Sequence, residues 1–285
     1  MTTTTWSSKC EVDSAADFNA LFVGIYNALV GTNGWVQTAD TTQINLSTNS
    51  SFPSTTNQSI GWQMWHMNDS LEASYPVFMK IEFGSGSGAT YPAIWITLGT
   101  GSDGSGNVTG IFMARTQIVV NGAGSSSASN FVCVKPNCLL IRLGQGSTTY
   151  QLAFVVERNH SSAGVDTTDG CLVLWQSGSS SIGSWYVPFA GGGPTSYAKW
   201  SCNPAPSGSG SLSPNINAYP VRAWNPGESV PFQMVAGFIN GDLAVNSTFS
   251  ITAWDGVART YITDAGGVIS ISVNAATAYA LWEHD

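Results

Sequence analysis

The spacing of apolar side chains predicts one helix, close to the start of the sequence. One face of this segment carries large apolar side chains at the 3.6-residue period of an α-helix, namely Phe18, Leu21, Phe22, Ile25 and Leu29. Ser14 and Asp17 have the spacing of a capping box, in which each side chain accepts a hydrogen bond from a backbone N–H group. Gly31 and Gly34 favour an end after the last apolar position. The pattern predicts an amphipathic helix over about residues 14–30, whose wide apolar face packs on a sheet or, alternatively, on another copy of the chain.

Most other apolar residues alternate with polar ones, which is the two-residue period of a β-strand. The clearest case is residues 75–84, where one side of the strand holds Val77, Met79, Ile81 and Phe83. The same pattern recurs in the segments 91–101, 150–157, 170–176, 231–238, 248–254 and 268–273. Short strands broken by Gly, Ser, Asn and Asp predict a mainly β fold, with antiparallel sheets in a β-sandwich or barrel-like arrangement. The spacing contains no βαβ unit, which argues against a parallel nucleotide-binding sheet.

The sequence predicts a single β-rich domain over residues 1–285, with some stretches outside the strand pattern. Residues 39–59 are polar and predict a long excursion between strands. The segment NPAPSGSGSLSP, residues 203–214, predicts an exposed loop or a linker; as a linker it would make residues 215–285 a separate C-terminal β module. The residues before the helix are interpreted as an N-terminal arm with Trp6 as its anchor.

Charged residues are scarce in this chain. Only 9% of the residues are Asp, Glu, Lys or Arg, against roughly a quarter in ordinary globular domains. Hydrophobic residues still make up 43% of the sequence, which distinguishes it from a disordered chain. The nine basic residues form no stripe and stand against seventeen acidic ones, so we expect neither a nucleic-acid nor a membrane partner. The first residues show no apolar stretch typical of a signal peptide, so we expect synthesis in the cytoplasm.

The sequence offers one cluster of ionisable residues, Glu157, Arg158 and His160, in FVVERNHSSAGVDTTDG. On an alternating strand Glu157 and Arg158 face opposite sides of the sheet, so they cannot share one pocket. The polar residues from 157 to 169 predict a hairpin loop that holds His160. We therefore interpret the cluster as the polar rim of a strand with a solvated loop. The sequence also contains no Gly-x-Ser-x-Gly, HExxH or P-loop motif, so we expect no enzyme.

Two features raise the question of a metal or cofactor. Asp103 and Asn107 lie in the loop GSDGSGN, where oxygen ligands could hold Ca²⁺, but too few carboxylates are present and a glycine hairpin is the favoured interpretation. Five cysteines include Cys133 and Cys138, whose separation fits neither a redox pair nor a zinc site. We interpret the cysteines as reduced, buried residues, and His66, which lies among aromatic residues, as a packing residue. No cofactor is expected.

Eleven tryptophans offer apolar area that either stacks on sugars or fills interfaces between subunits. Trp95 and Trp254 alternate with small or hydroxyl-bearing residues, and Trp62 and Trp65 fall on opposite faces of one strand. Packing inside the chain is the alternative for each of them. The candidate assembly or glycan contacts are Trp6, Trp65, Trp95 and Trp254.

A family resemblance is carried by the order of several segments: DFNALFVGIYNALVGTNGWVQTAD, WQMWHMND, PVFMKIEFGSG, PAIWITLGTGSDGSGNVTG and FVVERNHSSAGVDTTDGCLVLW. This succession, over about the first 175 residues, resembles virion structural proteins of tailed bacteriophages, of the tail or minor tail protein type. GFINGDLAVNSTFSITAWDGVARTYI has a looser likeness to them. The resemblance implies a β-rich subunit repeated around the particle axis and made in the host cytoplasm. It carries no functional residues to this sequence.

Together these observations predict a non-enzymatic virion subunit at the tail tip, the baseplate or another tail-associated position. Its expected partners are copies of itself, as a trimer or a higher ring, and other virion proteins. One alternative is a capsid decoration or head-associated protein. Another is a receptor- or carbohydrate-binding adhesin subunit that recognises a host surface glycan.

Overall fold

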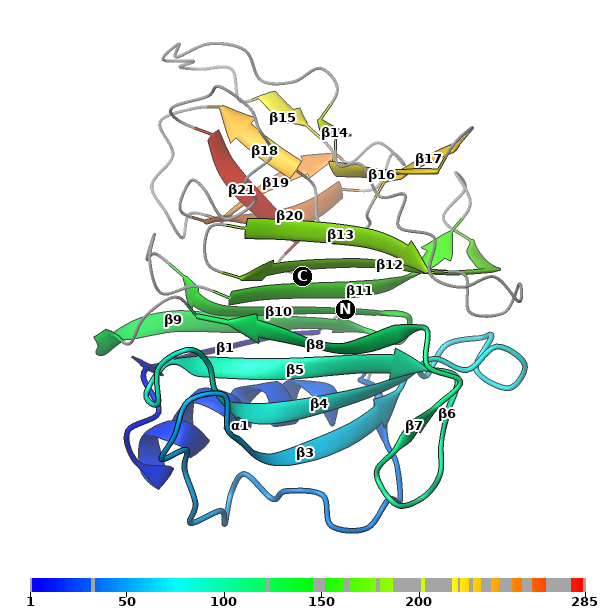
Figure 1. Cartoon of the computed structure of the whole chain (residues 1–285). Coiled ribbons are helices and arrows are strands. Elements are labelled where there is room, and N and C mark those ends of the chain that lie inside the picture. Colours follow the sequence, from blue (N-terminus) through cyan, green and yellow to red (C-terminus); the bar gives the residue numbers. More distant parts are fainter. Residues whose placement is uncertain are drawn as a thin grey trace.

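The computed structural model describes residues 2–31, 34–120, 124–145, 152–160 and 165–177, together with the backbone of separate strands between residues 180 and 283. In this part of the chain the fold is mainly β, with one helix near the N-terminus, as the sequence predicts (Figure 1). All of the strand pairs are antiparallel, and none of the sheets in the described part closes into a barrel.

The first half of the chain forms a five-stranded sheet. Its strands, in spatial order, are β2 (Val36–Gln37), β3 (Ser59–His66), β4 (Phe78–Ser85), β5 (Pro92–Gly99) and β8 (Met113–Val119). The short strands β6 (Gly101–Ser102) and β7 (Val108–Thr109) form a hairpin between β5 and β8. The segment 38–58 connects β2 to β3 without a strand of its own, as its polar sequence predicts.

A six-stranded sheet follows. Its order is β1 (Thr2–Cys10), β9 (Gly124–Lys135), β10 (Cys138–Gln145), β11 (Leu152–His160), β12 (Asp166–Ser177) and β13 (Ser180–Tyr186). The C-terminal part contributes two smaller sheets. One contains β14 (Ser201–Cys202), β16 (Val221–Asn225) and β17 (Glu228–Pro231). The other has the order β15 (Asn217–Tyr219), β18 (Gly237–Asn240), β21 (Ala278–Glu283), β20 (Ala258–Asp264) and β19 (Thr248–Thr252).

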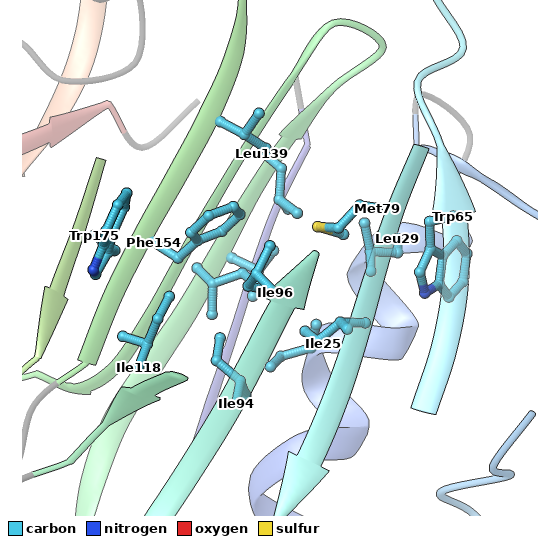
Figure 2. Packing of buried hydrophobic residues seen from close by; sticks show 14 of the residues in the cluster. Ile25, Leu29, Trp65, Met79, Ile94, Ile96, Ile118, Leu139, Phe154 and Trp175 are labelled. Carbon is cyan, nitrogen blue, oxygen red and sulfur yellow. The ribbon is translucent and has the colours of Figure 1, made fainter. Parts of the chain in front are cut away.

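The main core lies between the five-stranded and the six-stranded sheet, which form a β-sandwich (Figure 2). The predicted alternation in β4 is confirmed, because Met79, Ile81 and Phe83 are fully buried in this core while Phe78, Lys80 and Glu82 are only partly buried. Side chains from β10, β11 and β12 meet them from the six-stranded sheet. We call the opposite side of the five-stranded sheet its outer face.

Helix α1 (Ala15–Leu29) fills the space between the two sheets at the end where β1 and β3 lie. Phe22 packs on Phe83 of β4, with ring centroids 5.2 Å apart. Tyr26 packs on Trp65 of β3 at 5.9 Å. Because sheets cover the helix on more than one side, Gly24 and Ala28 are buried together with the five predicted apolar positions. This explains why the apolar face in the sequence is so wide.

The predicted capping box is present in altered form. Ser14 Oγ accepts a hydrogen bond from the Asp17 backbone N–H at 3.1 Å. The Asp17 carboxylate, however, accepts from the Ser14 hydroxyl at 2.6 Å and from Lys9 Nζ at 3.5 Å. The acidic side chain therefore fixes the capping serine and ties β1 to the start of the helix.

The interpretation of the N-terminal segment as an arm is wrong. Residues 2–10 form β1, which pairs with β9 along its whole length, from Thr2 opposite Val134 to Cys10 opposite Gly124. The indole ring of Trp6 lies against Gly24 of α1, where a Cβ atom would stand 2.4 Å from the ring. Trp6 therefore anchors a helix of its own chain to β1.

At β10 and β11, both faces of the six-stranded sheet are buried. Phe154 and Val156 face the main core, whereas Val155 and Leu140 face the other side and are equally inaccessible. This explains why β10 and β11 read as nearly continuous apolar runs. The alternation predicted for residues 150–157 correctly gives which side chains face the main core. It does not predict that the other face is buried as well.

Several predictions fall on the C-terminal part. Of the strand predicted for residues 231–238, Pro231 belongs to β17 and Gly237 and Phe238 belong to β18, while residues 232–236 lie outside the described residues. The strand predicted for residues 248–254 matches β19. The linker at 203–214, the strand at 268–273 and Trp254 lie outside the described residues.

Candidate functional site

A hollow of about 430 Å³ lies on the outer face, where β3 ends and β4 begins. It is lined by Gln37, Thr38, Ala39, Asp40, His66, Phe78, Ser102 and Gly104. His66 and Phe78 are cross-strand neighbours on the sheet. The other lining residues come from the segment after β2 and from the β6–β7 hairpin, which together form the walls.

Gln43 fixes the wall that follows β2. Its side-chain Nε2 donates to the backbone oxygens of Thr38, at 2.8 Å, and Asp40, at 3.1 Å. Its Oε1 accepts from the Met64 backbone N–H at 2.8 Å and from Gln37 Nε2 at 3.0 Å. Because the carbonyls can only accept and the N–H can only donate, this network fixes the orientation of both amides. Gln43 also satisfies the Met64 N–H of β3, beyond the short pairing of β3 with β2.

Asp40 joins this wall to the β6–β7 hairpin. Its Oδ1 accepts from the Ser102 hydroxyl, in a short hydrogen bond, and from the Gly106 backbone N–H at 2.8 Å. Burial alone would raise the pKa of Asp40, but hydrogen bonds from Ser102, Thr38 and the Gly106 N–H outweigh it and hold the pKa below its ordinary value. Asp40 is therefore a charged clamp between two loops that are distant in sequence.

The tip of the hairpin packs down onto the outer face. Gly106 has φ +90°, a left-handed conformation that favours glycine, and a Cβ atom there would lie 2.2 Å from the ring of Trp62. Lys80 Nζ lies 4.8 Å from the Trp62 ring centroid and donates to the Gly106 carbonyl at 2.8 Å. The hairpin is therefore held by an aromatic ring, a cation and the Asp40 carboxylate.

The loop GSDGSGN closes on itself. The Asp103 carboxylate accepts from the Asn107 side chain at 2.6 Å and from the backbone N–H groups of Ser105 and Asn107. These hydrogen bonds, led by that from the Asn107 side chain, lower the pKa of Asp103. Asp103 and Asn107 thus act as turn residues of a glycine hairpin. Across the described ranges, no cluster of three or more His, Cys, Asp or Glu side chains could hold a metal ion.

His66 is oriented by two acceptors. Its Nδ1 lies 3.0 Å from Glu72 Oε1 and 3.1 Å from the Met67 carbonyl oxygen. Since both partners are acceptors, Nδ1 carries a proton, and Nε2 is the ring nitrogen that faces away from them. The ring lies 5.2 Å from Phe78, tilted by 32°. His66 is thus more than the packing residue that its aromatic neighbours suggest.

The hollow is therefore rich in hydrogen-bond acceptors. His66 Nε2 and Gln37 Oε1 have no hydrogen bond to another described residue, and Asp40 adds a negative charge. The Ser102 hydroxyl donates to Asp40 and not to His66, so the hollow contains no serine–histidine pair of the hydrolase type. What the arrangement can do is hold a ligand that donates hydrogen bonds.

Known proteins add no assignment to this geometry. No protein-family model matches the sequence, and neither the curated proteins nor the solved structures compared with it include a match. Within the described ranges, no helix has the length and apolarity needed to cross a membrane.

In the ionisable cluster at the end of β11, Glu157 and Arg158 face opposite sides of the sheet, as the alternation predicts. Arg158 reaches Asp69, in the loop between β3 and β4, while Glu157 faces the other side of the sheet and accepts from the Cys138 thiol at 3.5 Å. The predicted hairpin loop from residue 157 is wrong, since β11 continues to His160 and β12 begins at Asp166. The predicted polar rim is also wrong, because the side chains of Glu157 and Arg158 are buried, whereas Val165 and Thr168 of the predicted loop are exposed, as expected. Arg158 is paired with a carboxylate 89 residues away in the sequence, which no local pattern reveals.

The tryptophans proposed as contacts do not come together. Trp6 packs on α1, and Trp65 is fully buried in the main core. Trp95 lies on the outer face but is only 3% exposed, because Arg115 stacks over its ring at 4.7 Å. Trp254 lies outside the described residues. Trp62 is partly exposed and lies beside Gly106 of the hairpin that forms one wall of the hollow.

The four cysteine side chains that the structure describes are buried, as predicted. Cys10, Cys133, Cys138 and Cys171 form no disulfide. Burial raises the pKa of the Cys10 thiol to about 11, against a smaller opposing effect of Arg142, and raises that of Cys171 to about 12. These thiols therefore remain protonated at neutral pH.

Proposed function

We propose that the chain is a non-enzymatic structural subunit of a bacteriophage virion, at the tail tip, the baseplate or another tail-associated position. The order of its sequence segments, which resembles that of tail-type virion proteins, supports this proposal. So does the mainly β architecture, which suits a subunit that is repeated around an axis.

The observation that carries the proposal is that charged side chains, few as they are, pair with one another within the fold. Arg158 and Asp69 join the six-stranded sheet to a loop of the other sheet. Arg115 donates two hydrogen bonds, of 2.7 and 2.9 Å, to the Glu82 carboxylate, and its guanidinium group covers the Trp95 ring. Each of these side chains holds a loop or a strand in place. They give a rigid scaffold rather than a set of groups that converge on a substrate.

A surface with few charges also suits assembly. Removing charged groups from water is costly, so a neutral surface of hydroxyl and amide groups is easier to bury against a neighbour. The expected neighbours are copies of the chain, as a trimer or a higher ring, and other virion proteins. A head-associated decoration protein would use the same surface properties at another place on the particle.

The test measures location and assembly together. The mass of the full chain is determined by light scattering at micromolar concentration, and an antibody against it is imaged on intact phage particles. We expect a trimer or a larger ring, and label at the tail. Label on the head would replace the tail assignment by the decoration alternative. A monomer that is absent from the particles would contradict the proposal.

A further inference from the structure

We infer that the hollow on the outer face, lined by Gln37, Asp40, His66 and Phe78 among others, is a binding site for a neutral sugar unit. Trp6, Trp65 and Trp95, the described tryptophans among those proposed from the sequence, do not line it. It is also independent of the virion proposal, because a sugar site can be present or absent whatever the location of the subunit.

The first argument is the match of hydrogen-bonding groups. Gln37 Oε1 is an acceptor and His66 Nε2 is a polar ring nitrogen that a hydroxyl can pair with, and the bonds on the other side of each group fix their orientation. A carboxylate offers about four acceptor sites, and the bonds from Ser102, Gly106 and Thr38 leave capacity on Asp40. A sugar presents several hydroxyl donors at short spacing, which is what this lining can receive.

The second argument is the apolar surface within the hollow. Phe78 is half-buried and lines the hollow beside the His66 ring, so part of its face is available to a ligand. The C–H face of a pyranose packs on such a ring while its hydroxyls reach the polar walls. Most binding sites combine an apolar lining with a few oriented polar groups.

The third argument concerns charge. Asp40 lines the hollow, and Glu72 lies behind His66. No Lys or Arg is among the lining residues, and the nearby Lys80 donates to the Gly106 carbonyl. An anionic sugar would therefore meet negative charge without a basic partner. This distinguishes neutral hexoses and N-acetylhexosamines from uronic and sialic acids.

The walls are fixed before a ligand arrives. Gln43 holds the segment after β2, and Asp40 holds the hairpin that carries Ser102. Binding then requires little ordering of the loops, which favours affinity. For a single sugar ring in an open site, we expect a dissociation constant on the order of 1 mM.

The experiment titrates the full chain with defined sugars and follows ligand saturation transfer by NMR. The neutral probes are methyl glucoside, methyl galactoside and N-acetylglucosamine, and the anionic comparators are glucuronic acid and N-acetylneuraminic acid. Ala39→Trp fills the hollow from an exposed position, and His66→Phe keeps an aromatic ring while removing Nε2. Gln117→Ala, on β8 at the other edge of the same sheet, is the matched control. It loses only an exposed hydrogen bond to Asn57.

We expect saturable binding of at least one neutral sugar, weakened at least about tenfold in Ala39→Trp and in His66→Phe and unchanged in Gln117→Ala. Circular dichroism checks that each variant is folded. If one of the two hollow variants does not fold, the other still tests the inference. Three results would overturn the inference. They are no binding of any neutral probe, equal binding by the wild type and the folded hollow variants, or a preference for the acidic sugars.

Discussion

Arg158 and Asp69 form a buried ion pair with two hydrogen bonds, which ties β11 to the loop between β3 and β4. Arg158 Nε and Nη2 lie 2.5 and 3.2 Å from the two Asp69 carboxylate oxygens, and Nη2 also donates to the Tyr75 carbonyl at 2.9 Å. The side chains are 0% and 2% exposed. The pair therefore joins the two sheets at one end of the sandwich, across 89 residues of sequence.

Removing one partner of this pair should be strongly destabilising. Asp69→Asn leaves a buried guanidinium without its counter-charge, so we expect the free energy of unfolding to fall by about 3–5 kcal/mol. Urea denaturation measures the change. Glu82→Gln, at the half-exposed pair with Arg115, is the matched control and should cost about 1 kcal/mol or less. A loss below 1 kcal/mol in Asp69→Asn would show that the pair does not join the sheets.

Gly24→Ala should destabilise the chain although alanine is the better helix former. The added methyl group would stand 2.4–2.5 Å from carbons of the Trp6 ring. Overpacking of this kind costs about 1–3 kcal/mol, against a gain of about 1 kcal/mol from helix propensity. We expect a net loss of up to about 2 kcal/mol in thermal unfolding. In a Trp6→Ala background the same substitution should become neutral or stabilising, and persistence of the loss there would refute the contact.

Two glycines of the β6–β7 loop should respond differently to alanine. Gly104 and Gly106 both have positive φ, but a Cβ atom at Gly104 meets nothing within 4 Å, whereas at Gly106 it meets Trp62. We expect a loss of about 1–2 kcal/mol for Gly104→Ala, from backbone strain alone. Gly106→Ala should lose about 1–3 kcal/mol more, because the ring must move. Equal melting temperatures for the two variants would argue against the packing of the hairpin on Trp62.

Acid should release the hairpin through Asp40. Because the folded-state pKa of Asp40 lies below its ordinary value, its contribution to stability is present above about pH 4 and is lost as pH falls through the lowered value. We expect the melting temperature of the wild type to fall more steeply below about pH 4 than that of Asp40→Asn. Ser102→Ala should reduce the difference, since it removes one bond that lowers the pKa. Parallel curves for wild type and Asp40→Asn would contradict this role.

The buried thiols should resist alkylation. Since burial raises the pKa of Cys10 to about 11 and that of Cys171 to about 12, both are almost entirely protonated at about pH 8 and lack the reactive thiolate. Iodoacetamide should modify neither residue in the folded chain and both in urea, as measured by peptide mass spectrometry. Modification of Cys171 without unfolding would show that β12 is not buried as described.

The features predictable from sequence are those that repeat at short range. The apolar spacing of Phe18 to Leu29 and the alternation in β4 depend on neighbours within one element, and both are confirmed. The second buried face of the six-stranded sheet was not predictable, because covering it depends on other parts of the chain. The same is true of β1, whose hydroxyl-rich sequence resembles a solvated arm until its pairing with β9 is known.

The candidate site was not predictable for the same physical reason. Gln43 looks like any polar loop residue, and its role appears only when the Met64 N–H and the Thr38 carbonyl are placed around it. Asp40 meets its partner Gly106 across 66 residues. A single histidine flanked by aromatic residues gave no sign of the Glu72 carboxylate that orients it.

The pairing of β1 with β9 has a consequence for synthesis on the ribosome. Thr3 and Cys133, which contact each other across the two strands, are 130 residues apart. At translation rates of about 5–20 residues per second, the first strand leaves the ribosome roughly 6–26 s before its partner exists. During that interval β1 has no partner strand, although α1 and the strands β3 and β4 on which it packs have already been made. The nascent chain is then most exposed to chaperones and to premature association, and a pause before β9 would lengthen that window.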